Sequence, residues 1–174
     1  MRGRLSFLAL RAAVAAFGAL PEPAMRRLGR WAGLVWYLVD PARRKMTQRH
    51  MRRVGESPSR AKEVFRSYGR YWAESFWVRP RRIPGLKRNL TVDGIENLRA
   101  AVAGNRGVVV VLPHLGNWEV AALIAHDLGL PVVAVAENLS NPRITEWFTA
   151  QRAMFGIEIV LTGGGGVTRR LLEC

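Results

Sequence analysis

The chain has 174 residues, 49% of them apolar, and 27 lysines and arginines against 13 acidic residues give it a formal net charge of +14. This length favours one domain with a real core, and a single cysteine excludes an internal disulfide. The charge calls for an anionic partner, such as nucleic acid, an anionic membrane surface or a coenzyme A thioester. Because the chain has no zinc-finger spacing, RNP-like aromatic pattern or helix-turn-helix, we do not expect nucleic acid as a partner.

The first predicted helix covers residues 1–20 and mixes arginines with a broad apolar face. Its uninterrupted apolar run is too short to cross a bilayer, which takes about 20 residues. Three interpretations remain: an amphipathic anchor lying in the membrane plane, a helix that covers the core, and a secretory signal whose apolar region Arg11 divides. We favour the anchor, because arginine can reach from an apolar surface to lipid headgroups.

Three more helices are expected before residue 85. Residues 24–39 begin with arginines and end in a tryptophan-rich apolar segment, which fits an interfacial helix or a core helix. Residues 42–54, capped by Asp40, are the most basic element, either a solvated face or a site for anionic lipid headgroups. Residues 57–77 carry an apolar stripe of core residues at helical spacing: Ala61, Val64, Phe65, Tyr68, Trp72 and Phe76.

A basic, proline-rich link at residues 79–85 separates two parts of the chain with different sequence patterns. We assign residues 1–85 to a helical, membrane-associating region and residues 86–174 to an α/β region. The α/β region alternates helices with short apolar runs, which predicts a largely parallel sheet flanked by helices. Strands are expected at residues 90–92, 108–112, 132–136 and 157–161, with helices at 95–103, 117–126 and 141–155. The glycine run 163–166 is a flexible turn or a place where backbone amides approach a phosphate.

The run from Gly107 to Glu119 is the main candidate site. Five apolar residues, four of them β-branched, predict a buried strand that delivers His114 to its carboxyl end, where open α/β sheets bind ligands. Glu119 follows five residues later, within reach of the imidazole if the turn folds back. A histidine oriented by a carboxylate is a general base for a hydroxyl group. Alternatively, Glu119 is only a first-turn helix carboxylate favoured by the helix dipole.

This run resembles the His-x4-acid motif of the bacterial lipid A acyltransferases and their actinobacterial relatives, the phosphatidylinositol mannoside acyltransferases. Further segments fall in the family's order, so the likeness covers nearly the whole chain: residues 67–72, 92–98, 135–137 and 161–164. The mannoside branch is nearest, although it carries aspartate at the position of Glu119. The family continues with a further strand, so we expect this chain to correspond to the N-terminal part of such an enzyme.

The resemblance implies an O-acyltransferase that moves a fatty acyl chain from acyl-CoA or acyl carrier protein to a hydroxyl of a membrane glycolipid, with no cofactor and no metal. His114 would be the general base and Glu119 would orient it. The resemblance further implies action at the cytoplasmic face of the bacterial plasma membrane, peripheral or anchored in plane. Substrate contacts are assigned by position to the amides of Gly116 and Asn117 and to Glu137, Arg143 and Arg152.

Two alternatives to an active enzyme remain. One is a catalytically inactive, membrane-binding fragment of such an enzyme, and the other is a basic nucleic-acid-binding domain supported by charge alone.

Overall fold

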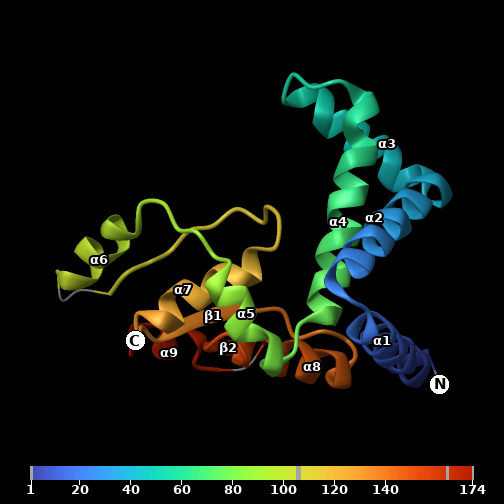
Figure 1. Ribbon diagram of the computed structural model, residues 1–174. Helices are drawn as coiled ribbons and strands as arrows, with labels where there is room; N and C mark the ends of the chain where they lie inside the picture. Colours follow the sequence, from blue (N-terminus) through green and yellow to red (C-terminus); the bar gives the residue numbers. More distant parts are fainter. Residues whose placement is uncertain (1, 105–106, 164, 174) are drawn as a thin grey trace. The chain divides into compact units, whose positions relative to one another are not determined.

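The computed structural model describes residues 2–104, 107–163 and 165–173, and it forms two compact units, Leu8–Arg79 and Met1–Phe7 with Pro80–Cys174 (Figure 1). The helices of the first half are α1 (Arg2–Ala19), α2 (Glu22–Val39), α3 (Pro41–Arg53), the 3-10 turn η1 (Pro58–Arg60) and α4 (Ala61–Trp77). The second half contains η2 (Pro80–Arg82), α5 (Ile83–Arg88), α6 (Ile95–Ala103), η3 (Trp118–Ala121), α7 (Ala122–Asp127), β1 (Val132–Ala136), α8 (Pro142–Ala153), β2 (Ile157–Leu161) and α9 (Val167–Leu172).

The helix starts in the Leu8–Arg79 unit follow from local sequence signals. The Asp40 side chain accepts a hydrogen bond from the Arg43 amide at 2.9 Å, and Pro41 occupies the first turn of α3, as predicted. Ser57 caps η1 in the same manner by accepting from the Ser59 amide. Both caps lie in the stretch that connects α2 to α4 along the chain, and α2 and α4 pack on each other.

Helices α2 and α4 pack closely because glycine removes side chains at their contact, and Figure 1 shows the two lying along each other. A Cβ on Gly29 would stand 2.5 Å from the Cβ of Ala73, and one on Gly33 would collide with the Phe65 carbonyl group. Gly69 of α4 likewise faces the backbone of both α2 glycines. The distance between packed helices depends on the side chains at the contact, so these residues set the geometry of the pair.

The buried face of α4 overlaps the predicted apolar stripe only in part. Ala61 and Phe65 of the stripe are buried and Val64 and Tyr68 are exposed, whereas Ala73 and Trp77 are buried outside it. The two faces differ because α4 turns its small residues toward the α2 glycines. Rings of the predicted stripe then line up along the helix: Tyr68 contacts Trp72 at 6.0 Å between centroids, and Trp72 contacts Phe76 at 5.5 Å.

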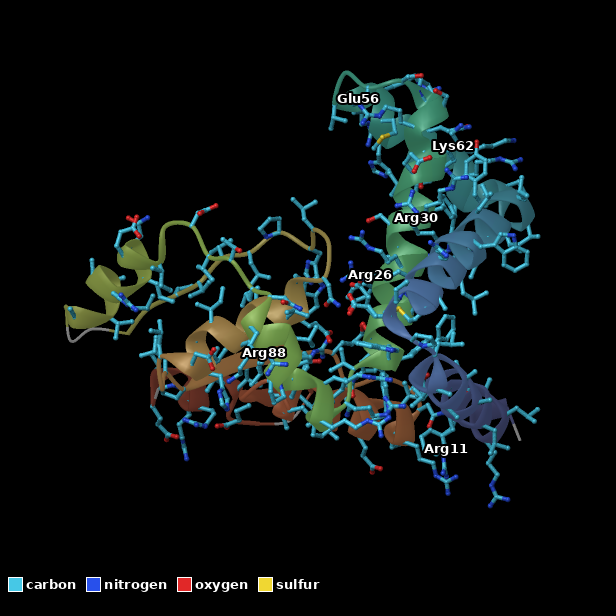
Figure 2. All side chains as sticks on the ribbon, in the orientation of Figure 1. Arg11, Arg26, Arg30, Glu56, Lys62 and Arg88 are labelled. Carbon is cyan, nitrogen blue, oxygen red and sulfur yellow. The ribbon has the colours of Figure 1, made fainter. Side chains whose placement is uncertain are left out.

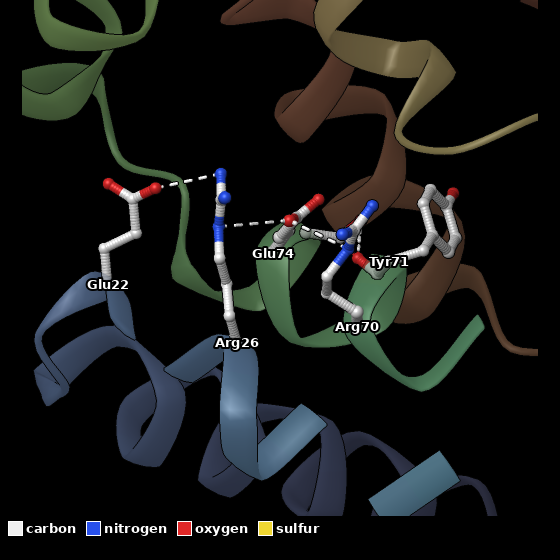
Figure 3. A network of polar contacts seen from close by, with 6 residues as sticks. Glu22, Arg26, Arg70, Tyr71 and Glu74 are labelled. Atoms are coloured by element: carbon white, nitrogen blue, oxygen red, sulfur yellow. Dashed lines mark hydrogen bonds and ion pairs between the residues drawn. The ribbon is translucent and has the colours of Figure 1, made fainter. Parts of the chain in front are cut away.

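Basic residues of α2 pair with acidic residues of α4. Arg26 and Arg30 lie one turn apart on α2 (Figure 2), and Arg30 reaches Glu63 at 3.4 Å. Arg26 pairs with both Glu22 at 2.9 Å and Glu74 at 3.5 Å (Figure 3). Arg70 also meets Glu74 at 3.5 Å, the pairing expected from its spacing of four residues on one helix.

The first helix forms as predicted and carries exposed apolar side chains, among them Leu5 and Leu8. At its beginning, the Asn141 amide group donates to the Gly3 carbonyl at 2.8 Å. Among the described residues, no helix combines the length and the apolar character that a membrane crossing would need.

The second unit is built on a β1–α8–β2 segment with a parallel strand pair. Val132 aligns with Ile157 and Ala136 with Leu161, and the Thr162 amide extends the ladder to the Ala136 carbonyl at 2.8 Å. Asn141 caps α8 by accepting from the Arg143 amide, as the sequence predicted. An α/β fold with parallel strands is therefore confirmed for residues 132–161.

Two predicted strands are wrong. Residues 90–92 and 107–115 have no strand structure, and in the second segment Val109 and Val111 are 89% and 90% exposed. An apolar β-branched run is stable as a strand only when neighbouring strands supply hydrogen bonds, and the described sheet contains β1 and β2 alone. The proline-rich link also contains a helix, α5, that we did not predict. Gly164, in the predicted glycine turn, lies outside the described residues.

Candidate functional site

His114 lies in an exposed loop, residues 107–117, just before η3. The loop contains a tight turn in which the Leu115 amide donates to the Pro113 carbonyl at 2.8 Å. Gly116 follows at φ +59°, a conformation that a residue with a side chain rarely adopts. The imidazole meets the indole of Trp118 edge to face, with ring centroids 4.7 Å apart. The turn therefore delivers an accessible histidine ring that contacts Trp118.

Glu119 is buried to 3% exposure in the first turn of η3, and its Oε1 accepts a hydrogen bond from Arg152 Nη2 at 3.2 Å. A carboxylate taken out of water needs a partner of opposite charge, and Arg152 supplies it. The sequence placed Glu119 against His114. In the structure the carboxylate meets Arg152, and Trp118 is the residue whose ring contacts His114. The orienting role of Glu119 stays a prediction.

Arg152 lies in the last turn of α8 with its guanidinium group between two aromatic rings. Its Cζ is 5.5 Å from the ring centroid of Trp118 and 5.6 Å from that of Phe148. Arginine is suited to this position because its planar, weakly hydrated cation stacks on aromatic faces. We call His114, Trp118, Glu119, Phe148 and Arg152 the Arg152 cluster. Within the described residues, the buried Nε of Arg152 has no hydrogen-bond partner.

The other predicted site residues belong to the same unit but not to the cluster. Glu137 is exposed directly after β1, at the carboxyl end of the strand, as its sequence position predicted. Arg143 is exposed near the start of α8, with its Cζ 5.8 Å from the Phe7 ring. Gly116 and Asn117 belong to the turn between His114 and η3. Substrate contacts by these four residues stay predictions.

Sequence reasoning missed Trp118 and Phe148. Both have a local signal, because Trp118 is four residues after His114 and Phe148 is four residues before Arg152, one helical turn away on α8. Sequence position alone suggests Arg152 as a contact for an anionic substrate. The spacing of Phe148 and Arg152 instead indicates a guanidinium cation in contact with an aromatic ring.

Other charged groups of this unit are structural. Lys87 Nζ lies 3.2 Å from His126 Nδ1 and contacts the Asp127 carboxylate, which joins α5 to α7. Arg170 donates to both oxygens of Glu158 at 2.8 and 2.6 Å, and this hydrogen-bonded pair holds the pKa of the Glu158 carboxyl below its ordinary value of 4.5. No group of three or more His, Cys, Asp or Glu side chains in the described part of the chain could hold a metal ion.

Comparison with known proteins gives two findings. The family model for bacterial lipid A biosynthesis acyltransferases matches residues 4–173. The phosphatidylinositol mannoside acyltransferase of Mycobacterium tuberculosis (strain CDC 1551 / Oshkosh) is 35% identical over 101 residues, which cover 57% of this chain and 32% of that protein. The protein of the same name from Mycolicibacterium smegmatis is 37% identical over 100 residues, covering 56% and 33% respectively. The chain therefore aligns with about a third of the length of these relatives.

Proposed function

Because the chain belongs to the bacterial lipid A biosynthesis acyltransferase family, we propose that it transfers a fatty acyl group from a thioester to a hydroxyl of a membrane glycolipid. The family match over residues 4–173 is the observation that carries this proposal. The donor would be acyl-CoA or acyl carrier protein, with no further cofactor. The names of the two mycobacterial relatives support a phosphatidylinositol mannoside as the acceptor.

His114 is the general base in this proposal. Its exposed imidazole takes the proton of the acceptor hydroxyl while that oxygen forms a bond to the thioester carbonyl carbon. Collapse of the tetrahedral intermediate breaks the carbon–sulfur bond, and the imidazolium returns its proton to the leaving thiolate. The reaction is balanced as ester plus thiol, and it needs no covalent enzyme intermediate.

Other residues stabilise charge in this scheme. The backbone amides of Gly116 and Asn117 follow His114 directly and are the candidates to donate to the oxyanion of the intermediate. Arg143 is exposed at the start of α8, where a guanidinium group can meet phosphates of an acyl donor. Glu137 is exposed directly after β1 and is the candidate to contact the acceptor.

The test of the catalytic base is acyl transfer from labelled acyl-CoA to phosphatidylinositol mannoside, measured for the wild type and for His114→Ala. Loss of a general base lowers the rate by about 100-fold or more, so we expect turnover to fall by at least that factor. His50→Ala is the matched control, because His50 is an exposed histidine of α3. Normal turnover by His114→Ala would remove this residue from the mechanism.

A second proposed property is peripheral binding to an anionic membrane, and it would hold even without catalysis. Trp31 is 62% exposed on α2, and Leu38 and Val39 are exposed at the end of the same helix. Arg43 and Arg44 lie in the first turn of α3, with their Cζ atoms 5.2 and 5.4 Å from the ring centroids of Trp36 and Tyr37. Exposed apolar residues beside arginines favour a lipid interface, and we propose the cytoplasmic face of the plasma membrane.

Sedimentation with anionic and neutral liposomes tests this property. We expect the wild type to pellet with anionic vesicles at low salt and to be released as salt rises. Trp31→Ser should weaken binding. The control Leu172→Ser removes an exposed apolar residue from α9 and should leave binding unchanged. A wild-type chain that stays in the supernatant at low salt would exclude this membrane surface.

A further inference from the structure

We propose that Arg152 is a positioning residue of the acyl-transfer site, which holds Glu119 and Trp118 in place and through Trp118 orients the His114 ring. This proposal rests on the proposed function and replaces the substrate-binding role that the sequence suggested for Arg152. The contacts that lead to it all lie inside one compact unit.

The first step is the ion pair. Glu119 is 3% exposed and accepts from Arg152 Nη2 at 3.2 Å, so an uncharged residue at 152 would take this cation away from a buried carboxylate. The pair joins η3, four residues after the His114 turn, to the end of α8, which is packed on β2. Arg152 thereby ties the short segment after His114 to the most regular part of the unit.

The second step is the set of contacts made by the Trp118 ring. The guanidinium lies 5.5 Å from the Trp118 ring centroid, and the His114 ring meets the same indole at 4.7 Å with an interplanar angle of 80°. Trp118 is therefore in contact with both the cation and the imidazole. Phe148 supports the guanidinium as well, at 5.6 Å. Since the indole is held by the cation beside it, removing the cation lets the indole move and the His114 ring turn with it.

The third step separates positioning from donor binding. An arginine that captures phosphates presents its N–H groups to solvent, as the exposed Arg143 does on the same helix. The Arg152 side chain is only 18% exposed, one of its Nη groups is engaged by Glu119, and two aromatic rings lie beside its guanidinium. These contacts favour a role inside the protein.

The test begins with nuclear magnetic resonance of the ligand-free chain. The chain has only three histidines, so the His114 imidazole signals can be assigned by comparison with His114→Ala. An indole changes the chemical shifts of a ring placed against it. The variant Trp118→Leu therefore gives the chemical shifts of His114 without this effect. We expect Arg152→Gln to move the His114 signals toward that position, while those of His50 stay in place. The control Arg170→Gln removes an arginine that pairs with Glu158 and should leave His114 unchanged.

Arg152→Lys decides the matter if Arg152→Gln does not fold. Lysine keeps a cation for Glu119 but lacks the planar group that stacks on Trp118, so the His114 signals should move part of the way. His114 signals at the wild-type position in the folded variants would overturn the proposal. Because this measurement needs no substrate, it remains decisive even if the wild type shows no acyl transfer, a result that would defeat only the proposed function.

Kinetics supply the second readout in a chain that transfers acyl groups. A misplaced base lowers the chemical step, so we expect kcat of Arg152→Gln to fall by about tenfold or more, with KM for the acyl donor unchanged within about twofold. Arg152→Lys should recover part of kcat. The opposite pattern, a raised KM with wild-type kcat, would assign Arg152 to donor binding and overturn the proposal.

Discussion

The α2–α4 pair and the Arg152 cluster are ordered by different physics. Helices α2 and α4 meet through the backbone at Gly29, Gly33 and Gly69, and ion pairs between the two helices, Arg26–Glu74 and Arg30–Glu63, accompany this contact. The Arg152 cluster instead encloses an ion pair, and the segment before it leaves Val109 and Val111 in solvent.

The difference shows where each region is vulnerable. The helix pair depends on shape, because an added methyl group has no room, whereas removal of an edge charge leaves the contact intact. The cluster depends on charge, because a buried carboxylate without a cation is costly. A region whose interior holds opposite charges beside an exposed histidine carries a cost in stability that the helix pair avoids, as expected for a functional site.

The largest effect should come from removing the cation of the cluster. We expect Arg152→Met to lower the free energy of unfolding by about 3 kcal/mol, because it removes the arginine that pairs with the buried Glu119 carboxylate. Urea denaturation followed by tryptophan fluorescence measures this loss. The double variant Arg152→Met/Glu119→Leu removes both charges and should recover most of the stability. Equal losses in the single and double variants would show that the ion pair is not what orders the cluster.

A smaller loss should follow from adding one methyl group to the helix pair. In Gly33→Ala the new Cβ collides with the Phe65 carbonyl group, and overpacking of this kind costs about 1–3 kcal/mol. Gly107→Ala is the matched control, since nothing lies within 4 Å of a Cβ there. Its unfolding free energy should differ from that of the wild type by less than about 0.5 kcal/mol. Equal effects of the two substitutions would contradict the close approach of α2 and α4.

A third test compares the bond that the Asn141 side chain accepts with the bonds that it donates. Asn141 accepts from the Arg143 amide at 3.3 Å, which caps α8, and donates to the Gly3 carbonyl at 2.8 Å and to the Ser6 hydroxyl at 3.1 Å. Loss of an N-cap costs about 1 kcal/mol, so Asn141→Ala should lower the unfolding free energy by about that amount. Asn141→Asp keeps the capping oxygen and should retain most of the stability. If the aspartate variant is as unstable as the alanine variant, the donations to Gly3 and Ser6 carry the stability instead.

These contrasts also explain what the sequence could predict. Helix 95–103 and strands 132–136 and 157–161 form at the predicted residues, because glycines bound them and their apolar patterns are local. Strand 108–112 was wrong despite its composition, since a strand requires partners that no local pattern reveals.

The candidate site was predictable only in part. The turn at His114 follows from the motif, but the segment before it is an exposed loop where a buried strand was predicted. Glu119 and Arg152 are 33 residues apart, so no spacing rule indicates their pairing. A buried ion pair between distant residues depends on how η3 meets α8, which is a tertiary property. Trp118 carries no acid–base group, so the His114–Glu119 spacing does not indicate its contact with the imidazole.

The smallest expected effect concerns two carboxyl groups, the half-buried Asp40 and the exposed Glu158, whose pKa values are lowered by different causes. The pKa of Asp40 is held below 3.8 mainly by the hydrogen bond from the Arg43 amide, and that of Glu158 below 4.5 mainly by its hydrogen bond to the Arg170 side chain. A carboxyl group whose pKa is lower in the folded state adds stability at a pH above its ordinary pKa, and this stability is lost as the pH falls through the lowered pKa.

The free energy of unfolding, measured from pH 7 to 2, should show the loss of both contributions. The Asp40 contribution should be absent in Asp40→Asn, and the Glu158 contribution should be absent in Glu158→Gln. Salt should weaken the Glu158 contribution more, because an ion pair is screened and a hydrogen bond from a neutral amide is screened less. Equal salt dependence of the two contributions would show that Arg170 acts on Glu158 through hydrogen-bond geometry alone, without the long-range charge that distinguishes it from the Arg43 amide.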